Sequence, residues 1–330
     1  MSIREQLRER RTSWGARLSF GVVLLVFSEG IVWQTPTTFT APEWIGLAAI
    51  YLALAAAALD LIARWRVNEA LSLFMLAGLY GVINATLISH ITSEGKPFAL
   101  AVRPLAAQPL AFMAALAAFQ ILASGRATGP RDFGVALATG LLWGVWVRWF
   151  PEASDNPVPA VEVGTALVML AVGLIACLAI RFALPPADIY RREDWRLTPF
   201  EWAFVVAILW AALLYGYAQE EISDTALGIV VLLGGFLTAV LRMSARVRRD
   251  TTYLESITPP RRPNPAAWIV LIVPFLVMGA IGYSLPGSGD SATQSDLLFG
   301  ALTGFGVVWP PTVSALIGIR VFAQLAREGM

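Results

Sequence analysis

Long apolar runs separated by short polar segments dominate the pattern of this chain. Each run is continuously apolar and lacks the alternation that a membrane β-barrel strand requires. About 20 such residues in a helix cross the roughly 30 Å hydrocarbon core of a bilayer. The pattern therefore predicts an all-α polytopic membrane protein with ten transmembrane helices. The predicted spans are 16–34, 42–63, 70–90, 104–124, 131–150, 161–183, 200–219, 224–243, 266–285 and 296–320.

Composition supports this fold class and excludes several functions. The 330 residues are 57% hydrophobic and only 14% charged, which is the composition of an integral membrane protein and not of a soluble enzyme. The net charge of +1 gives no basic surface for nucleic acid. A single cysteine, Cys177, and a single histidine, His90, exclude an intramolecular disulfide and a multi-histidine metal or haem site. We therefore expect no metal and no cofactor.

The distribution of basic residues predicts the orientation of the helices. Lys and Arg resist translocation, so cytoplasmic loops collect them. With ten helices and a cytoplasmic N-terminus, all of the 24 basic residues except Lys96, Arg103 and Arg148 fall on the cytoplasmic side. This asymmetry predicts that both termini are cytoplasmic and that the chain is a multi-pass protein of a bacterial or archaeal inner membrane.

Two longer cytoplasmic loops, 185–199 and 244–265, are polar and rich in proline and arginine. Either loop is a candidate docking site for a protein partner or for anionic lipid headgroups of the surrounding bilayer. The alternative is that both loops are linkers whose arginines only set the topology.

Short sequence matches predict an internal repeat that divides the single membrane domain, residues 1–330, into halves 1–158 and 159–330. The spacing of about 160 positions corresponds to five helices, and an odd number inserts the second copy upside down relative to the first. We therefore expect a 5+5 inverted repeat; the alternative is chance similarity between membrane helices. The matched pairs are Glu43-Trp44 with Glu201-Trp202, Arg103-Pro104 with Arg262-Pro263, Gly78 with Gly235, and Thr139-Gly140 with Thr303-Gly304.

Ionisable side chains inside membrane spans are costly and are therefore the first candidates for function. Glu29 is the deepest acidic residue, in the outer part of the first predicted helix, where it can carry a proton or bind a cation for coupling. The alternative is an ion pair with Arg103, Arg148 or His90, which are predicted in the same leaflet. His90 itself either senses external pH or simply ends its helix at the interface.

The last predicted helix contains GFGVVWPP at 304–311, a sequence that forms helices poorly. Pro310 and Pro311 remove two backbone amides and so free two carbonyls. We expect the helix to be interrupted here, beside protein or a cavity that accommodates the freed groups. The alternative is a proline kink that only assists packing. The matching segment TGLLWG at 139–144 has the glycines without the prolines.

A substrate site between the two halves would lie near the membrane midplane. Asn84 is also a candidate for a hydrogen bond between helices. The predicted lining residues are Tyr80, Asn84, Thr139, Gly140, Thr238, Thr303, Gly304, Pro310 and Pro311.

Motifs argue against most enzyme and pump classes. The chain contains no Walker A sequence, no His-Glu-x-x-His pattern and no Gly-x-Ser-x-Gly elbow, so we assign no catalytic residues. The favoured function is a secondary transporter or channel-like carrier of a small solute, coupled to a proton or cation. The alternatives are a non-catalytic subunit or scaffold of a larger membrane complex and, third, a lipid-acting membrane enzyme.

Overall fold

The chain is helical wherever the structure describes it. A computed structural model describes residues 3–32, 39–94, 97–149, 162–184, 192–245, 251–258, 260–285 and 291–327, and all regular structure in these residues is helical, which confirms the all-α class. The α-helices are α1 (Ile3–Leu25), α2 (Ala41–Arg64), α3 (Ala70–Leu87), α4 (Pro97–Val102), α5 (Gln108–Ser124), α6 (Pro130–Trp149), α7 (Val163–Ala183), α8 (Pro199–Ala218), α9 (Asp224–Ile229), α10 (Gly235–Ala245), α11 (Pro265–Ser284) and α12 (Ser291–Arg327). Three π-helical turns are η1 (Val26–Ile31), η3 (Arg103–Ala107) and η5 (Val230–Gly234), and three 3-10 turns are η2 (Ile91–Glu94), η4 (Arg192–Trp195) and η6 (Tyr253–Ile257).

Nine helices within the described residues are long and apolar enough to cross a membrane. The remaining predicted span, 131–150, also forms a helix, α6. Its mean hydropathy is lower than that of the nine because Arg131, Asp132 and Arg148 lie within its 20 residues. The structure thus describes a multi-pass membrane protein. The count of ten crossings and the side on which the termini lie stay predictions.

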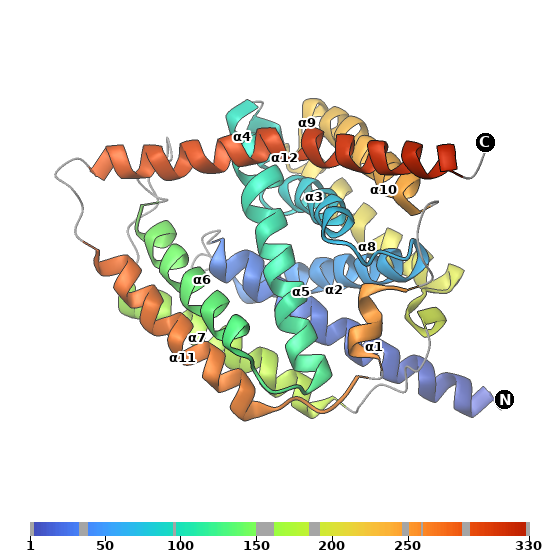
Figure 1. The fold of residues 1–330 in the computed structure, drawn as a ribbon, viewed down its shortest axis with the longest axis horizontal. Coiled ribbons are helices and arrows are strands. Elements are labelled where there is room, and N and C mark those ends of the chain that lie inside the picture. The colour runs from blue at the N-terminus through green and yellow to red at the C-terminus, as the bar shows by residue number, and fades with distance from the viewer. Residues whose placement is uncertain are drawn as a thin grey trace.

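The helices from the two predicted halves pack against one another. Figure 1 shows α6, α7 and α11 grouped on one side, α5 running through the centre and α12 crossing the upper edge. Helix α6 packs along α11, α1 along α2, and α3 along α5. The repeat would relate α1 to α7, α2 to α8, α3 to α10 and α6 to α12, and each of these pairs is in contact. These contacts are compatible with the inverted repeat, which stays a prediction.

The core lies among α1, α2, α3 and α5, where Phe20, Met75 and Phe112 are fully buried. Helix α8 instead leaves large apolar side chains such as Phe200 and Trp210 exposed. This distribution fits helices whose outer faces contact lipid.

Helix α12 is continuous through Pro310 and Pro311, so the predicted interruption at 304–311 is wrong. The missing amides remove only two hydrogen bonds from a 37-residue helix, and the bonds on either side hold it. Gly306 packs against α4: a Cβ added to it would lie 2.0 Å from the carbonyl oxygen of Ala101. The segment therefore serves close helix packing, as the alternative interpretation expected.

The matching segment at 139–144 also packs a helix. A Cβ added to Gly140 or Gly144 of α6 would lie 2.2 Å from the carbonyl oxygen of Phe275 or 2.0 Å from that of Gly279, both on α11. Small residues allow two membrane helices to approach this closely. The structure thus gives Gly140 a packing role instead of a place in a site.

The two Glu-Trp matches are helix N-terminal capping boxes. Thr40 with Glu43 opens α2, and Thr198 with Glu201 opens α8. A capping box satisfies free amides of the first helical turn, so the match has a local structural reason whether or not the halves are related.

Candidate functional site

A cluster of buried polar side chains lies where η1, α2 and α3 meet. The Tyr51 hydroxyl on α2 donates to Oε1 of Glu29 in η1. Nδ2 of Asn84 on α3 donates to the hydroxyl oxygens of Tyr51, at 2.9 Å, and Tyr80, at 3.2 Å. The Tyr80 hydroxyl also lies 2.5 Å from Oγ of Ser28. These five residues, which we name the Glu29 cluster, are each at most 4% exposed.

Local sequence explains why these side chains meet. Tyr80 and Asn84 are four residues apart on α3, so both extend from the same helix face. Glu29 lies in a π-turn, whose wider winding changes the direction of its side chains relative to an α-helix. Gly21 lets α1 approach α2 closely, because a Cβ added there would lie 3.1 Å from Cα of Leu52.

Several buried polar atoms in and beside the Glu29 cluster have no hydrogen-bond partner among the described residues. They are Oε2 of Glu29, Oδ1 of Asn84 and both amide atoms of Gln108, the first residue of α5. Proteins leave few such atoms unsatisfied, so these call for a proton, an ion or a water molecule. Arg103 of η3 is close enough for its charge to act on Glu29. The site therefore offers a carboxylate and amide oxygens to a proton or a small cation.

Indole groups from α6 hold the end of η1. Nε1 of Trp143 donates to the carbonyl oxygen of Gly30 at 3.2 Å, and Nε1 of Trp146 donates to that of Val32 at 2.9 Å. The last carbonyls of a helix have no hydrogen-bond donor within that helix. Here the two indole N–H groups are the donors. The geometry of the turn that carries Glu29 thus depends on α6.

Trp309 on α12 holds η3 in a similar way. Pro109 has no N–H, so the carbonyl of Leu105, four residues earlier, lacks its usual helical partner. Nε1 of Trp309 donates to that carbonyl oxygen. Gly78 on α3 makes room for the indole, because a Cβ added there would lie 2.6 Å from the ring. Trp309, in the 304–311 segment, therefore replaces the backbone donor that Pro109 lacks in the span of η3 and α5.

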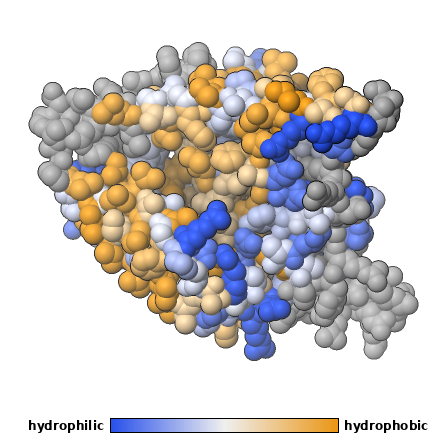
Figure 2. Space-filling model, viewed as in Figure 1, coloured by the Kyte–Doolittle hydropathy of each residue, from blue (hydrophilic) through white to orange (hydrophobic). Residues whose placement is uncertain are grey.

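A cavity of about 950 Å³ lies between α5, α6 and α11 and reaches η1. Phe27 and Ile31, which belong to the same π-turn as Glu29, line its inner end. Apolar side chains form most of its wall, and Thr139 lies among them. Figure 2 shows the hollow with hydrophobic residues around its rim.

The structure brings together three of the predicted site residues and separates the others. Glu29, Tyr80 and Asn84 meet in one cluster, with Arg103 near it. Of the three residues predicted as ion-pair partners of Glu29, Arg103 acts on its carboxylate, whereas His90 and Arg148 interact with other residues.

His90 and Arg148 each interact with residues outside the Glu29 cluster. Nδ1 of His90 lies 3.5 Å from Oε2 of Glu221, and burial lowers the pKa of His90 although the Glu221 carboxylate opposes this effect. Arg148 donates to the carbonyl oxygens of Tyr283, at 2.9 Å, and Leu285. Both residues thus join neighbouring segments at the ends of spans.

The predicted midplane site does not form as one group. Thr139 and Thr303 donate to carbonyls of their own helices, those of Val135 and Phe299, both at 2.7 Å. A Cβ added to Gly304 would meet nothing within 4 Å. Thr238 lies on a different helix, α10, while Pro310 and Pro311 lie on α12, further along the helix that carries Thr303 and Gly304.

Sequence reasoning missed Ser28 and Tyr51. Tyr51 lies in an otherwise apolar run of α2. A buried Tyr hydroxyl needs a hydrogen-bond partner, so this residue could have been recognised as part of a polar cluster. Ser28 adjoins Glu29 in the sequence.

The described parts of the two longer polar loops, 185–199 and 244–265, pack on the chain itself. Turn η4 contacts α2, and η6 contacts α5 and α2. The amide of Tyr253 in η6 donates to the carbonyl oxygen of Val67 at 2.8 Å. Residues 185–191, 246–250 and 259 of these loops lie outside the described residues, and a partner at either loop stays a prediction.

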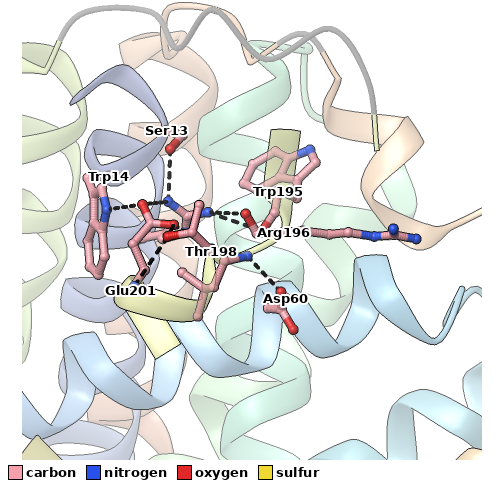
Figure 3. A network of polar contacts seen from close by, with 9 residues as sticks. Ser13, Trp14, Asp60, Trp195, Arg196, Thr198 and Glu201 are labelled. Carbon is pink, nitrogen blue, oxygen red and sulfur yellow. Dashed lines mark hydrogen bonds and ion pairs between the residues drawn. The ribbon is translucent and has the colours of Figure 1, made fainter. Parts of the chain in front are cut away.

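A second buried network lies near the start of the first candidate membrane span, Ser13–Ile31. Fully buried Arg17 donates from Nη1 to Oγ of Ser13, at 2.8 Å, and from Nη2 to the carbonyl oxygen of Trp195, at 3.1 Å. Its guanidinium lies 4.0 Å from the Glu201 carboxylate, which also accepts from the Trp14 indole at 2.8 Å. Figure 3 shows this arrangement, which we name the Arg17 network; it joins α1, η4 and α8.

Comparison of the chain with protein-family models, with curated proteins and with solved structures gives no match. The class of the protein therefore rests on its fold, that of an all-α, multi-pass membrane protein.

Proposed function

We propose that this protein is a secondary transporter or channel-like carrier of a small solute, coupled to a proton or cation at Glu29. The observation that supports this most is the position of η1. Within this one π-turn, Ser28 and Glu29 belong to a buried polar cluster, whereas Phe27 and Ile31 line a large cavity. π-turns inside membrane helices occur frequently at functional sites.

The Glu29 cluster has the chemistry that coupling requires. Tyr51 donates to one carboxylate oxygen of Glu29, and the other, Oε2, has no partner among the described residues. Oε2 can bind a cation, or it can take a proton and become a donor. Asn84 then supplies an acceptor, its unpartnered Oδ1. Binding of a proton or a cation to Glu29 changes the charge within this set of hydrogen bonds. A local change of charge of this kind can drive a conformational switch.

Coupling also requires that the loaded site affects the solute pathway. Because η1 carries both the carboxylate and part of the cavity wall, a change of its winding would move Phe27 and Ile31 together with Glu29. Trp143 and Trp146 connect the same turn to α6, which forms another wall of the cavity. We propose that loading of Glu29 alters the cavity through these contacts.

Proteoliposomes test the proposal directly. Uptake is measured under an inward proton gradient and, separately, an inward sodium gradient. The probes are a radiolabelled alkylsulfonate, a lipophilic phosphonium cation and a neutral sugar. We expect gradient-driven uptake of at least one probe, and Glu29→Gln should reduce it at least about tenfold. The control is Glu43→Gln, which changes an exposed capping residue of α2.

The outcomes separate the alternatives. Unchanged uptake in Glu29→Gln, with Glu43→Gln also unchanged, would overturn the coupling role of Glu29. Absence of gradient-driven uptake for all three probes would count against a carrier and favour a subunit or scaffold of a membrane complex. The exposed apolar face of α8, with Phe200, Trp210 and Leu214, would then be the surface to examine for a partner.

A further inference from the structure

The cavity between α5 and α6 is open toward the bilayer. Leu110, Val135 and Leu142 line it and are also 41%, 54% and 60% exposed, so they form a rim on the outer surface of the helices. Its volume of about 950 Å³ lies within the range of small-molecule sites. An apolar molecule can therefore enter sideways from the lipid, without passing through water.

Charged residues line this cavity at one end only. Arg126, Arg131 and Asp132, at the junction of α5 and α6, are the charged side chains among its described lining. Arg126 pairs with Asp132 at 2.9 Å, and Arg131 makes no ion pair with another described residue. The cavity thus has an apolar body and a basic end.

A second segment adds positive charge beside this end. The amide of Arg261 donates to the carbonyl oxygen of Ala123 at 2.6 Å. Gly125, with φ of 60°, permits this approach, because a Cβ added to it would lie 2.4 Å from the carbonyl oxygen of Arg262. The side chains of Arg261 and Arg262 are exposed. The backbone contacts of this segment therefore place two further, exposed arginines near the polar end of the cavity.

We infer that this cavity binds an anionic lipid of the surrounding bilayer, with an acyl chain along α5 and α6 and the acidic headgroup at Arg126 and Arg131. The apolar wall suits a hydrocarbon chain, and guanidinium groups bind phosphate oxygens in a bidentate geometry. The exposed rim supplies the lateral entrance that a bilayer lipid needs. This inference goes beyond the proposed carrier function and does not depend on it.

Native mass spectrometry of the purified, delipidated protein tests the inference. Phosphatidylglycerol and phosphatidylcholine with identical acyl chains are titrated separately, and bound lipid is counted. We expect the wild-type protein to prefer phosphatidylglycerol by about tenfold, because its headgroup has a net negative charge, whereas the choline cation of phosphatidylcholine offsets its phosphate. Combining Arg126→Ala with Arg131→Ala should reduce this preference to near one. Asp132→Asn, which removes the opposing charge, should increase it.

Matched variants separate the cavity from general effects. Arg320→Ala removes another exposed, ion-paired arginine, on α12, and should leave the lipid preference unchanged. Ala117→Trp fills the cavity from its exposed rim and should weaken binding of both lipids. Ala211→Trp, at an exposed site on α8 that does not line the cavity, should not.

Two results would overturn the inference. One is equal binding of the two lipids by the wild-type protein. The other is an unchanged preference in the double arginine variant together with unchanged binding in Ala117→Trp, provided that thermal unfolding shows both variants to be folded. Neither result affects the Glu29-dependent uptake experiment, so failure of this inference and failure of the proposed function remain distinguishable.

Discussion

The first membrane helix carries two buried charged side chains whose surroundings differ. Arg17 has a carboxylate, a hydroxyl and backbone carbonyls from three elements around its guanidinium. Glu29, twelve positions later, has a single hydroxyl donor, Tyr51, and a carboxylate oxygen without a partner among the described residues. Both are at most 1% exposed. Burying a charge costs free energy in each case, and the first charge has more hydrogen-bonding and ionic partners than the second.

This difference indicates what each charge does. A charge whose partners come from fixed backbone and a counter-ion holds those elements in place. A charge with spare bonding capacity can accept a proton or an ion without breaking existing contacts. We therefore interpret the Arg17 network as structural and the Glu29 cluster as chemical, and the predictions below test this distinction.

Loss of Arg17 should have the largest effect on stability. Arg17→Met leaves the Glu201 carboxylate largely buried without its counter-ion, and we expect the free energy of unfolding to fall by about 3 kcal/mol. Equilibrium unfolding in mixed micelles measures this value. Arg320→Met, which breaks an exposed pair with Glu69, should cost no more than about 1 kcal/mol. Equal effects of the two substitutions would contradict a structural role for the Arg17 network.

Trp309→Phe should have an intermediate effect. It keeps an aromatic ring against Phe74, whose centroid lies 5.8 Å away, but leaves the Leu105 carbonyl without its indole donor. An unsatisfied buried carbonyl costs about 2 kcal/mol. Trp210→Phe, at an exposed position of α8, is the control and should be nearly neutral in the same unfolding assay. A neutral Trp309→Phe would show that the Leu105 carbonyl finds another donor.

Glu29→Gln should change stability little while removing coupled uptake. The amide oxygen of Gln still accepts from Tyr51, so we expect the free energy of unfolding to change by less than about 1 kcal/mol. A loss as large as that of Arg17→Met would mean that Glu29 also holds the fold. The distinction between a structural Arg17 network and a chemical Glu29 cluster would then be wrong.

The smallest effect is a pH dependence at His90. Burial lowers the pKa of His90 in the folded protein, so the unfolded chain binds the proton more readily. The stability contributed by neutral His90 is complete above the unfolded pKa of about 6.5 and is lost as the pH falls from there through the lower pKa of the folded state. His90→Asn should remove this part of the pH dependence of the melting temperature. Asn also tolerates the positive φ of 51° at this position.

Much of the fold could be predicted from apolar periodicity, but helix continuity could not. Every predicted span contains helix in the described residues. Helix α12 continues through Pro310 and Pro311, and its Gly306 packs closely on Ala101 of a different helix. Local propensity contains no information on such contacts between helices.

The candidate site was predictable only in part, for a related reason. Glu29 was recognisable because a charge within an apolar run is costly. Its partner Tyr51 lies on the next helix, and which residues face each other depends on helix rotation. The π-turn η1 sets that rotation, and nothing in the composition of VFSEGI indicates a π-turn. For the same reason, the sequence did not indicate that His90 and Arg148 interact with residues outside the Glu29 cluster.

The contact between Trp309 and the Leu105 carbonyl has an evolutionary consequence. It exists because Pro109 lacks an amide hydrogen and because Gly78 leaves space for the indole ring. A chain that regains an amide at 109 no longer needs the indole, and a side chain at 78 excludes it. Residues 78, 109 and 309, on three separate spans, should therefore vary together among related sequences as they diverge.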